Sequence, residues 1–140
     1  MFIKQLSIFV ENQVGRLESI LDCLGKNNIN ISALSLADTT DFGIMRVIVD
    51  DAKKAKELLN EIGVIAKITD VIAVYVDDRS GGLMPILSIL KENGLGIEYM
   101  YAFLGRTEGK ALMVLKAEDE EKAAVVLSQK GIKLASMDHI

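Results

Sequence analysis

Residues 9–34, FVENQVGRLESILDCLGKNNINISAL, return 66 positions later as residues 75–100, YVDDRSGGLMPILSILKENGLGIEYM. The two stretches agree at a turn glycine, along one apolar helix face and in the strand that follows. After a short insertion the match resumes at residues 55–64 with a shift of 68. Because these positions meet separate steric demands, their joint repetition indicates a duplicated structural unit. We therefore predict two domains, residues 1–70 and residues 71–140.

The first copy has the pattern of a strand, a helix, two strands, a second helix and a last strand. Apolar residues alternate in the first segment, and Leu17, Ile20 and Leu24 then recur at the spacing of one helix face. The predicted elements are a strand at 3–10, a helix that follows Gly15 and stops at Asn27, strands at 29–37 and 43–49 joined by a turn at 38–41, a helix over 52–62 that closes at Gly63, and a strand at 64–69.

The second copy repeats this order, with Pro85 in the first turn of its first helix. Its predicted elements are a strand at 71–77, a helix at 82–93, strands at 95–104 and 110–117, a helix at 119–130 and a strand at 132–137. The order βαββαβ predicts an α+β fold of two ferredoxin-like units, each an antiparallel sheet covered by helices on one face. Because only Asp70 separates the copies, we expect them to be rigidly coupled.

The uncovered face of each sheet needs protection, and the two copies differ there. Strand 95–104 is predicted to present bulky residues on one face, whereas the matching positions of the first copy are small. One interpretation is that these faces meet, within a chain or across a dimer; the other is that the aromatic residues belong to the helix-covered core. The residues concerned are Ile97, Tyr99, Tyr101 and Phe103 in the second copy and Ile31, Ala33, Ser35 and Ala37 in the first.

Composition excludes several classes of partner. The net charge of -4, with 16 basic residues scattered among 20 acidic ones, provides no basic stripe for nucleic acid. No apolar run reaches the roughly 18 to 20 residues of a membrane span, and no signal peptide begins the chain, so we expect a cytoplasmic protein. Cys23, the only cysteine, is expected to be a buried small apolar residue rather than a reactive thiol.

The sequence also lacks the groups of a catalytic or metal site. His139 is the only histidine and stands next to the C-terminus, where we expect a solvated residue. No metal or cofactor site and no nucleophile with a matched base are predicted, so we do not expect an enzyme. The acidic stretches 50–51 and 118–121 each stand where a helix is predicted to begin, and there negative charge complements the helix dipole.

The turns that follow the first strand of each copy are the recurring irregular feature. Each delivers the N-terminus of a helix, whose free amide groups favour a carboxylate, while Asn12 or Asp78 could accept from an ammonium group. Together these are the parts of an amino-acid site. The alternative is that Gly15 and Gly81 serve chain geometry and that Asn12 and Asp78 only cap helices.

The pattern Asn12-x-x-Gly15-x-Leu17, followed by a helix and then Asn30-Ile31, resembles the ACT domain, a small-molecule-binding regulatory module. The resemblance covers both copies and is closest to free-standing tandem ACT proteins. It implies that units pair through their sheets and that an amino acid binds between the turn of one unit and a strand of its neighbour. The implied ligand-binding residues are Asn12, Gln13, Val14, Gly15, Arg16, Asn30 and Ile31 in the first copy and Asp78, Ser80 and Gly81 in the second.

Some positions depart from that pattern. Val14 replaces the usual proline of the turn, and Val10 stands where serine-sensing relatives carry histidine, which argues against a serine site of that kind. Asp78 and Gly96 replace both asparagines in the second copy. The first-copy site is therefore preferred.

The leading hypothesis is a regulatory protein, expected as a homodimer, that binds a free amino acid at ACT–ACT interfaces and signals to a separate metabolic enzyme. Two alternatives stay open. One is a protein-interaction subunit similar to the small subunit of acetolactate synthase, for which ligand is optional. The other is an enzyme on the same scaffold, since this fold carries many activities. The sequence does not identify the amino acid, the partner enzyme or the number of occupied sites.

Overall fold

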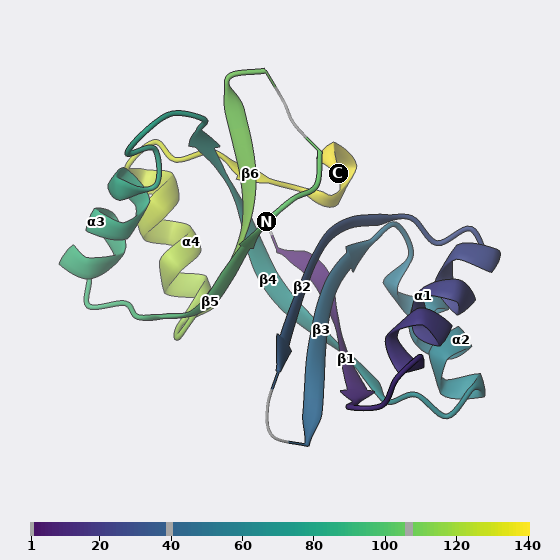
Figure 1. Ribbon diagram of the computed structural model, residues 1–140. Helices are drawn as coiled ribbons and strands as arrows, with labels where there is room; N and C mark the ends of the chain where they lie inside the picture. Colours follow the sequence, from purple (N-terminus) through teal and green to yellow (C-terminus); the bar gives the residue numbers. More distant parts are fainter. Residues whose placement is uncertain (1, 39–40, 106–107) are drawn as a thin grey trace. The chain divides into compact units, whose positions relative to one another are not determined.

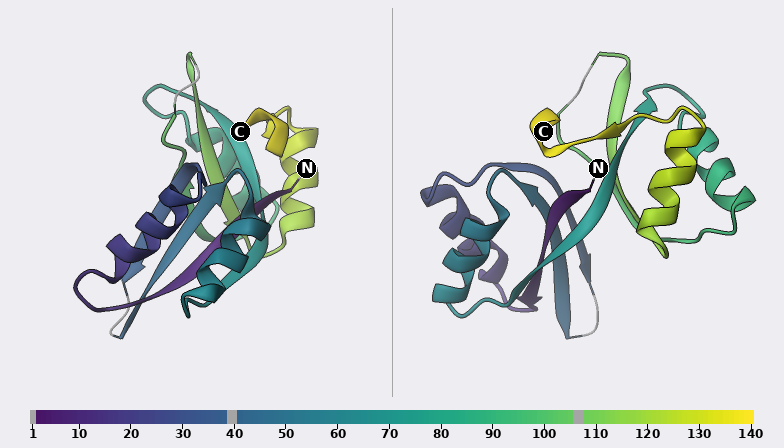
Figure 2. Two further views of the ribbon diagram at one scale, coloured as in Figure 1. Left: turned by 90° about the vertical axis from the view of Figure 1, so that its right-hand side faces the viewer. Right: turned by 180° about the vertical axis from the view of Figure 1, so that it is seen from behind.

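A computed structural model describes residues 2–38, 41–105 and 108–140. The chain divides into an N-terminal unit, Lys4–Thr69, and a C-terminal unit that combines residues 2 and 3 with 70–140. In each unit two helices lie on the same side of an antiparallel sheet (Figures 1 and 2). The predicted α+β class and the two ferredoxin-like units are confirmed. The division falls inside one strand, and the domain boundary at 70 and 71 stays a prediction.

The N-terminal unit contains β1 (Ile3–Glu11) except its first residue, α1 (Arg16–Lys26), β2 (Ile31–Asp38), β3 (Phe42–Val49), α2 (Ala52–Glu61) and the first residues of β4 (Ala66–Asp77). Its strand order is β2-β3-β1-β4. Strand β3 pairs antiparallel with both neighbours, so Gly43 lies beside Val10 on one side and Asp38 on the other. Strands β1 and β2 are therefore parallel, and their carboxyl ends reach the same edge of the sheet.

Alternate residues of these strands form the core beneath the two helices. Leu6, Ile8 and Val10 of β1 meet Ile20 and Leu24 of α1 in one buried cluster. The cluster also contains Ile29, Met45, Val47, Val49, Ala55, Leu59, Val64 and Ala66. Cys23, predicted to be buried, is only half-buried, although it does pack against the same core.

The C-terminal unit consists of the rest of β4, α3 (Met84–Glu92), β5 (Ile97–Ala102), β6 (Lys110–Ala117), α4 (Glu120–Gln129), β7 (Leu134–Ala135) and a short 3-10 helix, η1 (Met137–His139). Strand β4 pairs with β6 on one side and with β7 on the other, and β5 pairs with β6. Its separate core contains Ile72, Val74, Val76, Ile86, Leu90, Leu95, Leu115, Ala117, Ala123, Ala124 and Leu127, with Phe2 packed against it.

A β-bulge changes the predicted face of one aromatic strand. The register shifts between Ile97 and Tyr99, so Glu98 is the extra residue of the bulge. Ile97 stands beside Ala117 of the core, whereas Tyr101 stands beside Val114, which is not a core residue. The prediction that Ile97 shares a face with the tyrosines is therefore wrong, and the alternative that Tyr99 and Tyr101 belong to the helix-covered core is also wrong.

The same bulge occurs in the first copy at the matching position. There the register shifts between Ile31 and Ala33, with Ser32 as the extra residue. Ile31 consequently packs against the N-terminal core, and it does not share a face with Ala33 as the alternation predicted. In β5 the rings of Tyr99 and Tyr101 stack on the helix-free face, with centroids 6.5 Å apart. The duplication thus preserved an irregularity of the backbone as well as its periodicity.

Element ends differ from the predictions in three places. The predicted strands at 64–69 and 71–77 are one continuous strand, β4. Helix α3 begins at Met84 rather than at residue 82, because the amide of Gly82 donates to the Arg79 carbonyl oxygen in a turn. The last strand is only Leu134–Ala135 and is followed by η1.

Other predicted ends are confirmed. Asn27 ends α1, Gly63 follows α2 with a φ of 78°, and Pro85 lies in the first turn of α3. The predicted turn at 38–41 includes residues 39 and 40, which lie outside the described residues. His139 is exposed as expected, and its Nδ1 accepts a hydrogen bond from the Ser136 amide at 3.2 Å. No helix of the described ranges is long and apolar enough to cross a membrane.

The acidic helix starts have the structural role predicted for them. The Asp51 carboxylate accepts from the Lys54 amide at 3.0 Å, and the Asp119 carboxylate accepts from the Lys122 amide at 3.1 Å. These are N-cap bonds, which satisfy amides that the helix itself leaves free.

Glu120, the first residue of α4, lies in a less solvated environment. Its side chain is 11% exposed, its Oε1 accepts from the Ala117 amide at 3.1 Å, and its buried Oε2 has no partner among the described residues. Burial raises the pKa of the Glu120 carboxyl above its usual range, although the Ala117 amide and the Lys116 ammonium, 3.5 Å away, oppose this effect. The ionised form is therefore disfavoured in the folded chain.

This environment predicts a pH-dependent effect of the Glu120→Gln substitution. A raised folded pKa contributes stability that is present below the unfolded value of about 4.3 and is lost as pH rises through the folded pKa. Glutamine does not titrate, so the thermal midpoint of the variant should rise relative to wild type between pH 4 and pH 7. Scanning calorimetry across this range measures the difference. The exposed Glu121 provides the matched control, since Glu121→Gln should leave the wild-type profile in place; a Glu120→Gln offset independent of pH would contradict the assignment.

Candidate functional site

The turn between β1 and α1 is shaped by local backbone bonds. The amide of Gln13 donates to the Glu11 carbonyl oxygen at 2.8 Å, and the amide of Arg16 donates to the Gln13 carbonyl oxygen at 3.2 Å. Gly15 then directs the chain into α1 with a φ of 86°, a left-handed conformation that favours glycine. The predicted site residues 12–15 are therefore presented together at the N-terminus of the helix, and all four are exposed.

Several hydrogen-bonding groups of this turn are unused. Among the described residues, the amides of Val14, Gly15, Leu17 and Glu18 have no acceptor, and the Asn12 side chain has no partner. Helix α1 has no side-chain cap. The alternative that Asn12 only caps the helix is therefore wrong. The unpaired amides and the positive end of the helix dipole provide an environment that suits an anion such as a carboxylate.

A hollow of about 260 Å³ adjoins the turn. Asn12, Gln13 and Leu17 contribute one side, and Leu36 and Asp38 at the end of β2 contribute the other. Val10, Glu11 and Gly43 complete it. The neighbouring carboxylates Glu11 and Asp38 would suit an ammonium group, and Leu36, which is 50% exposed, offers an apolar surface.

Sequence reasoning missed Glu11, Leu36 and Asp38 as parts of this hollow. They join it because β1 and β2 are parallel and end at the same edge, on either side of Gly43 of β3. The available signal was the strand order of the predicted ferredoxin-like unit, which places the ends of the first two strands close together.

The matching turn of the second copy adjoins a similar hollow of about 270 Å³. Asp78 and Gly81 line it, and Gly81 has a φ of 76° like its counterpart Gly15. Asp78 does not cap α3, whose N-cap is Leu83 without a side-chain bond, so the capping alternative is wrong here too. Ser80 lies exposed in the same turn.

Charge distinguishes the second turn from the first. Asp77 Oδ1 is paired with Lys110 Nζ, and Asp77 Oδ2 lies 3.6 Å from Arg79 Nε. The hydrogen bond and positive charge of Lys110, with a smaller contribution from Arg79, hold the pKa of the Asp77 carboxyl below its usual range. The corresponding residues of the first copy are Glu11, Phe42 and Gln13, which cannot form this cluster.

Asn30 and Ile31 do not join the turn within their own unit. Ile31 pairs with Val49 whereas Asp38 pairs with Gly43, so the two ends of β2 are separated by about 20 Å. The backbone amide of Asn30 donates to Asp50 Oδ1 at 3.1 Å. The Asn30 side chain is exposed and has no hydrogen-bond partner among the described residues. The Ile31 side chain packs against the core. The structure therefore does not bring Asn12 and Asn30 of one unit together.

Two further predicted features have clear positions. Arg16, the first residue of α1, is partly exposed, and its guanidinium has no ion-pair partner among the described residues. In the second copy the Glu118 carboxylate lies over Gly96, where a Cβ would collide with it. The position that matches Asn30 is thus occupied by a carboxylate rather than by an amide.

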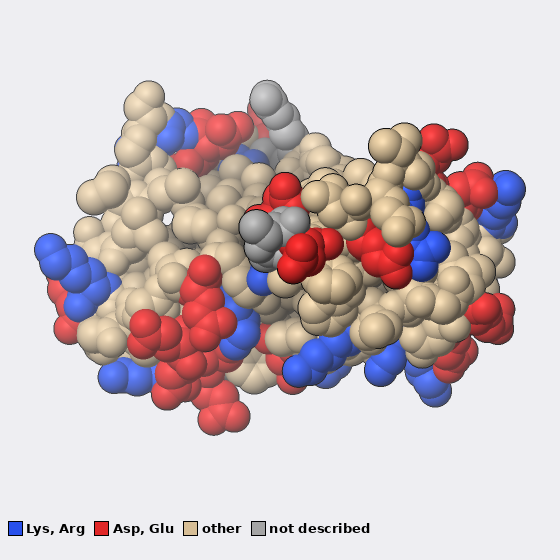
Figure 3. Space-filling view, turned by 60° about the horizontal axis from the view of Figure 1, so that its bottom comes forward, with Lys and Arg blue, Asp and Glu red and all other residues tan. Residues whose placement is uncertain are grey.

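The charged surface gives little indication of other sites. On the face shown in Figure 3, acidic side chains gather over part of the surface and basic ones are scattered, without a broad basic patch. Within the described ranges, no group of three His, Cys, Asp or Glu residues could hold a metal ion.

Comparisons with known proteins decide the family. The sequence profile of the ACT domain pair matches residues 1–139. The chain belongs to the ACT domain family. No curated protein matches this ACT domain pair at a significant level.

Among solved structures, protein BT0572 of Bacteroides thetaiotaomicron is similar to this ACT domain pair at 39% identity and a TM-score of 0.91, covering 98% of this chain and 94% of that one. The ligand-free regulatory subunit of aspartate kinase from Thermus thermophilus has 20% identity and a TM-score of 0.62, covering 91% and 92%. The corresponding subunit from Thermus flavus has 18% identity and a TM-score of 0.59, covering 90% of each chain. The two Thermus structures share the fold.

Replacing a glycine by alanine should have opposite effects on stability at Gly15, which has a positive φ, and at Gly25, which does not. Gly15→Ala should lower the free energy of unfolding by about 1 kcal/mol, because alanine resists the left-handed conformation. Gly25→Ala, inside α1 and free of steric contact at Cβ, should raise it by about 0.5–1 kcal/mol. Urea denaturation of both variants measures these differences, and a stabilising Gly15→Ala substitution would show that the turn is not held in this conformation.

Proposed function

We propose that this ACT domain pair is a regulatory protein that binds a free amino acid at the turn after β1 and transmits the binding state to a separate metabolic enzyme. The main support is the combination of unused amides with the unpartnered Asn12 side chain beside a hollow. The amides of Val14 and Gly15 would receive the ligand carboxylate, with Arg16 close by. Asn12 Oδ1 and the carboxylates of Glu11 and Asp38 would face its ammonium group.

The hollow is small for an amino acid on its own. Small-molecule sites are typically about 300–1,000 Å³, and this one is about 260 Å³ and open to solvent. A second surface would complete it. In the proposed homodimer, Asn30 of another copy would supply that surface, because its side chain is exposed and its own unit holds it far from the turn.

Regulation would follow from differential affinity. A ligand that contacts two units stabilises only the arrangement in which both contacts form, and it shifts the equilibrium by the difference in its binding free energies. Couplings of this kind are typically about 1–3 kcal/mol, which changes an affinity by roughly 5- to 150-fold. The enzyme that reads this change would need to bind one arrangement better than the other.

Amino-acid binding is tested by a thermal-shift screen of the twenty amino acids at millimolar concentration, followed by calorimetry of any hit. Ligand at about 100 times its Kd should add about 2.7 kcal/mol, or several degrees in Tm. Asn12→Ala and Asn30→Ala should each weaken binding about tenfold, because each removes a hydrogen bond to a charged or polar group of the ligand. Neither should change the Tm without ligand by more than about 1 °C.

Asn60→Ala is the matched control. Asn60 is an exposed asparagine near the end of α2 that does not line the hollow, and its substitution should leave the affinity unchanged. Sedimentation equilibrium with and without ligand tests the dimer. Full binding by both Asn12→Ala and Asn30→Ala, or by a strictly monomeric chain, would remove these residues from a shared site.

A second candidate function is a docking subunit that binds an enzyme without requiring ligand. The observation that favours it is the exposure of Phe9, Phe42 and Ile65, at 44%, 51% and 68%. Phe9 and Ile65 are strand neighbours, since the Phe9 amide donates to the Ile65 carbonyl oxygen at 3.0 Å. A complex with an amino-acid-biosynthetic enzyme that survives exhaustive dialysis and is lost in a Phe42→Ser variant would favour this candidate over the sensor.

A further inference from the structure

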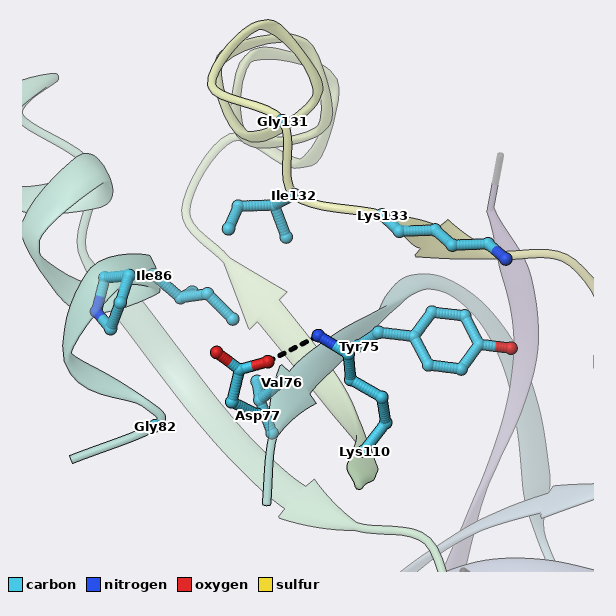
Figure 4. A pocket seen from close by; sticks show the side chains of 10 residues that line it. Tyr75, Val76, Asp77, Gly82, Ile86, Lys110, Gly131, Ile132 and Lys133 are labelled. Atoms are coloured by element: carbon cyan, nitrogen blue, oxygen red, sulfur yellow. Dashed lines mark hydrogen bonds and ion pairs between the residues drawn. The ribbon is translucent and has the colours of Figure 1, made fainter. Parts of the chain in front are cut away.

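A larger pocket lies inside the C-terminal unit, away from the Asn12 turn. Its volume is about 480 Å³, which is within the usual range of small-molecule sites. Figure 4 shows that β4, the first turn of α3 and the segment after α4 surround it. All of these belong to the C-terminal unit, so the pocket needs no other part of the chain.

The walls of this pocket are apolar and firmly held. Val76 and Ile86 are 6% and 2% exposed and belong to the C-terminal core, and Ile132 packs against that core. Pro85 adds a rigid ring from the first turn of α3. These four side chains form a surface suited to a branched or linear hydrocarbon group, not to a hydrated ion alone.

The polar groups of the pocket have an excess of positive charge. Lys110 Nζ donates to Asp77, and its remaining donors are unused among the described residues. Asp77 is also close to Arg79, so its single negative charge is already matched by two cations. Lys133 Nζ lies over the Tyr75 ring, 5.1 Å from its centroid, and has no carboxylate partner in the described parts of the chain.

The two copies differ at both lysines of the pocket, whereas two of its wall residues are the same in each. By the internal repeat, Val76 and Ile86 correspond to Val10 and Ile20, which keep the same residue types. Lys110 and Lys133 correspond to Phe42 and Ile65, which carry no charge. The cations are therefore not demanded by the fold.

A glycine lines one side of the pocket. Gly82 packs its backbone against the Asp77 carbonyl oxygen so closely that a Cβ would collide there, and α3 starts only at Met84. The corresponding residue of the first copy, Arg16, is already helical. The late start of α3 leaves the side of the pocket near Gly82 without a side chain.

We propose that this pocket binds a small carboxylic acid with an aliphatic body of about four to six carbon atoms. Lys110 holds the carboxylate, the positive charge of the lining residue Lys133 adds longer-range attraction, and Val76, Ile86 and Ile132 pack against the hydrocarbon. Charge-assisted hydrogen bonds to a carboxylate are the strongest polar contacts available to these side chains. The site is independent of the proposed amino-acid site, because it uses other residues and requires no ammonium group.

The experiment titrates 4-methylpentanoate into the full chain labelled with ¹⁵N, at pH 7 and low ionic strength, and follows amide chemical shifts. Low salt limits the screening of exposed charges. The acid should shift the amides of residues 82–84, 86 and 131–133. Its neutral isostere 4-methylpentanamide and the short acid acetate should each bind about tenfold more weakly, since each lacks one of the two recognised parts.

Substitutions at two lysines provide the matched comparison. Lys110→Gln should weaken binding of 4-methylpentanoate about tenfold, whereas Lys130→Gln, at an exposed lysine that does not line the pocket, should leave it unchanged. An unchanged spectrum outside the pocket confirms that each variant folds. Equal binding of the acid and its amide, equal effects of the two substitutions, or shifts confined to the Asn12 turn would overturn the proposal.

A peptide ending in an apolar residue offers the same chemistry through its C-terminal carboxylate. Acetyl-Gly-Leu is therefore titrated beside 4-methylpentanoate. Tighter binding of the free acid assigns a small metabolite, and tighter binding of the peptide assigns the end of a protein chain. Both results support a carboxylate site, and the absence of binding by either compound contradicts it.

Discussion

The packing of two helices against alternate residues of four antiparallel strands is the constraint on which both units depend. It requires β1 to lie between β3 and β4, and it requires the chain to leave β1 through a sharp turn that returns a helix across the sheet. Gly15 and Gly81 meet that requirement with positive φ values of 86° and 76°. Because the first turn of each helix is thereby left uncapped, the same geometry that builds the core also exposes unpaired amides at one edge of each sheet.

Much of this arrangement could be predicted from the sequence, because hydrophobic periodicity and the internal repeat both reflect the need to bury one face of each helix and strand. The stripe of Leu17, Ile20 and Leu24, the stop at Asn27 and the cap at Gly63 each have a local cause, and the structure confirms the helices that they define. The face assigned to Ile31 and Ile97 failed, and three element ends also differed, such as the start of α3 at Met84. An extra residue such as Ser32 or Glu98 has no chemical signature, since the bulge depends on the partner strand and not on the residue type.

The candidate site was predictable in part. The residues of the turn are contiguous, so their joint exposure follows from the motif, but Glu11, Leu36 and Asp38 join them only through the order of the strands. Asn30 shows the reverse problem. Its place in the motif suggests proximity to Asn12, whereas the length of β2 holds the two apart within one unit. A sequence motif can contain residues that belong to one binding site without showing whether that site is formed by one unit or by several.

The division of the chain inside β4 has a consequence for any attempt to separate the two halves. Residues 66–69 of this strand belong to one unit and residues 70–77 to the other, and Phe2, at the start of the chain, packs on the core of the second unit. A break at residue 70 would cut a strand in two and would separate Phe2 from its core. The first half expressed alone would therefore end in a severed strand, and the second half alone would begin with the rest of that strand and lack a residue that packs on its core.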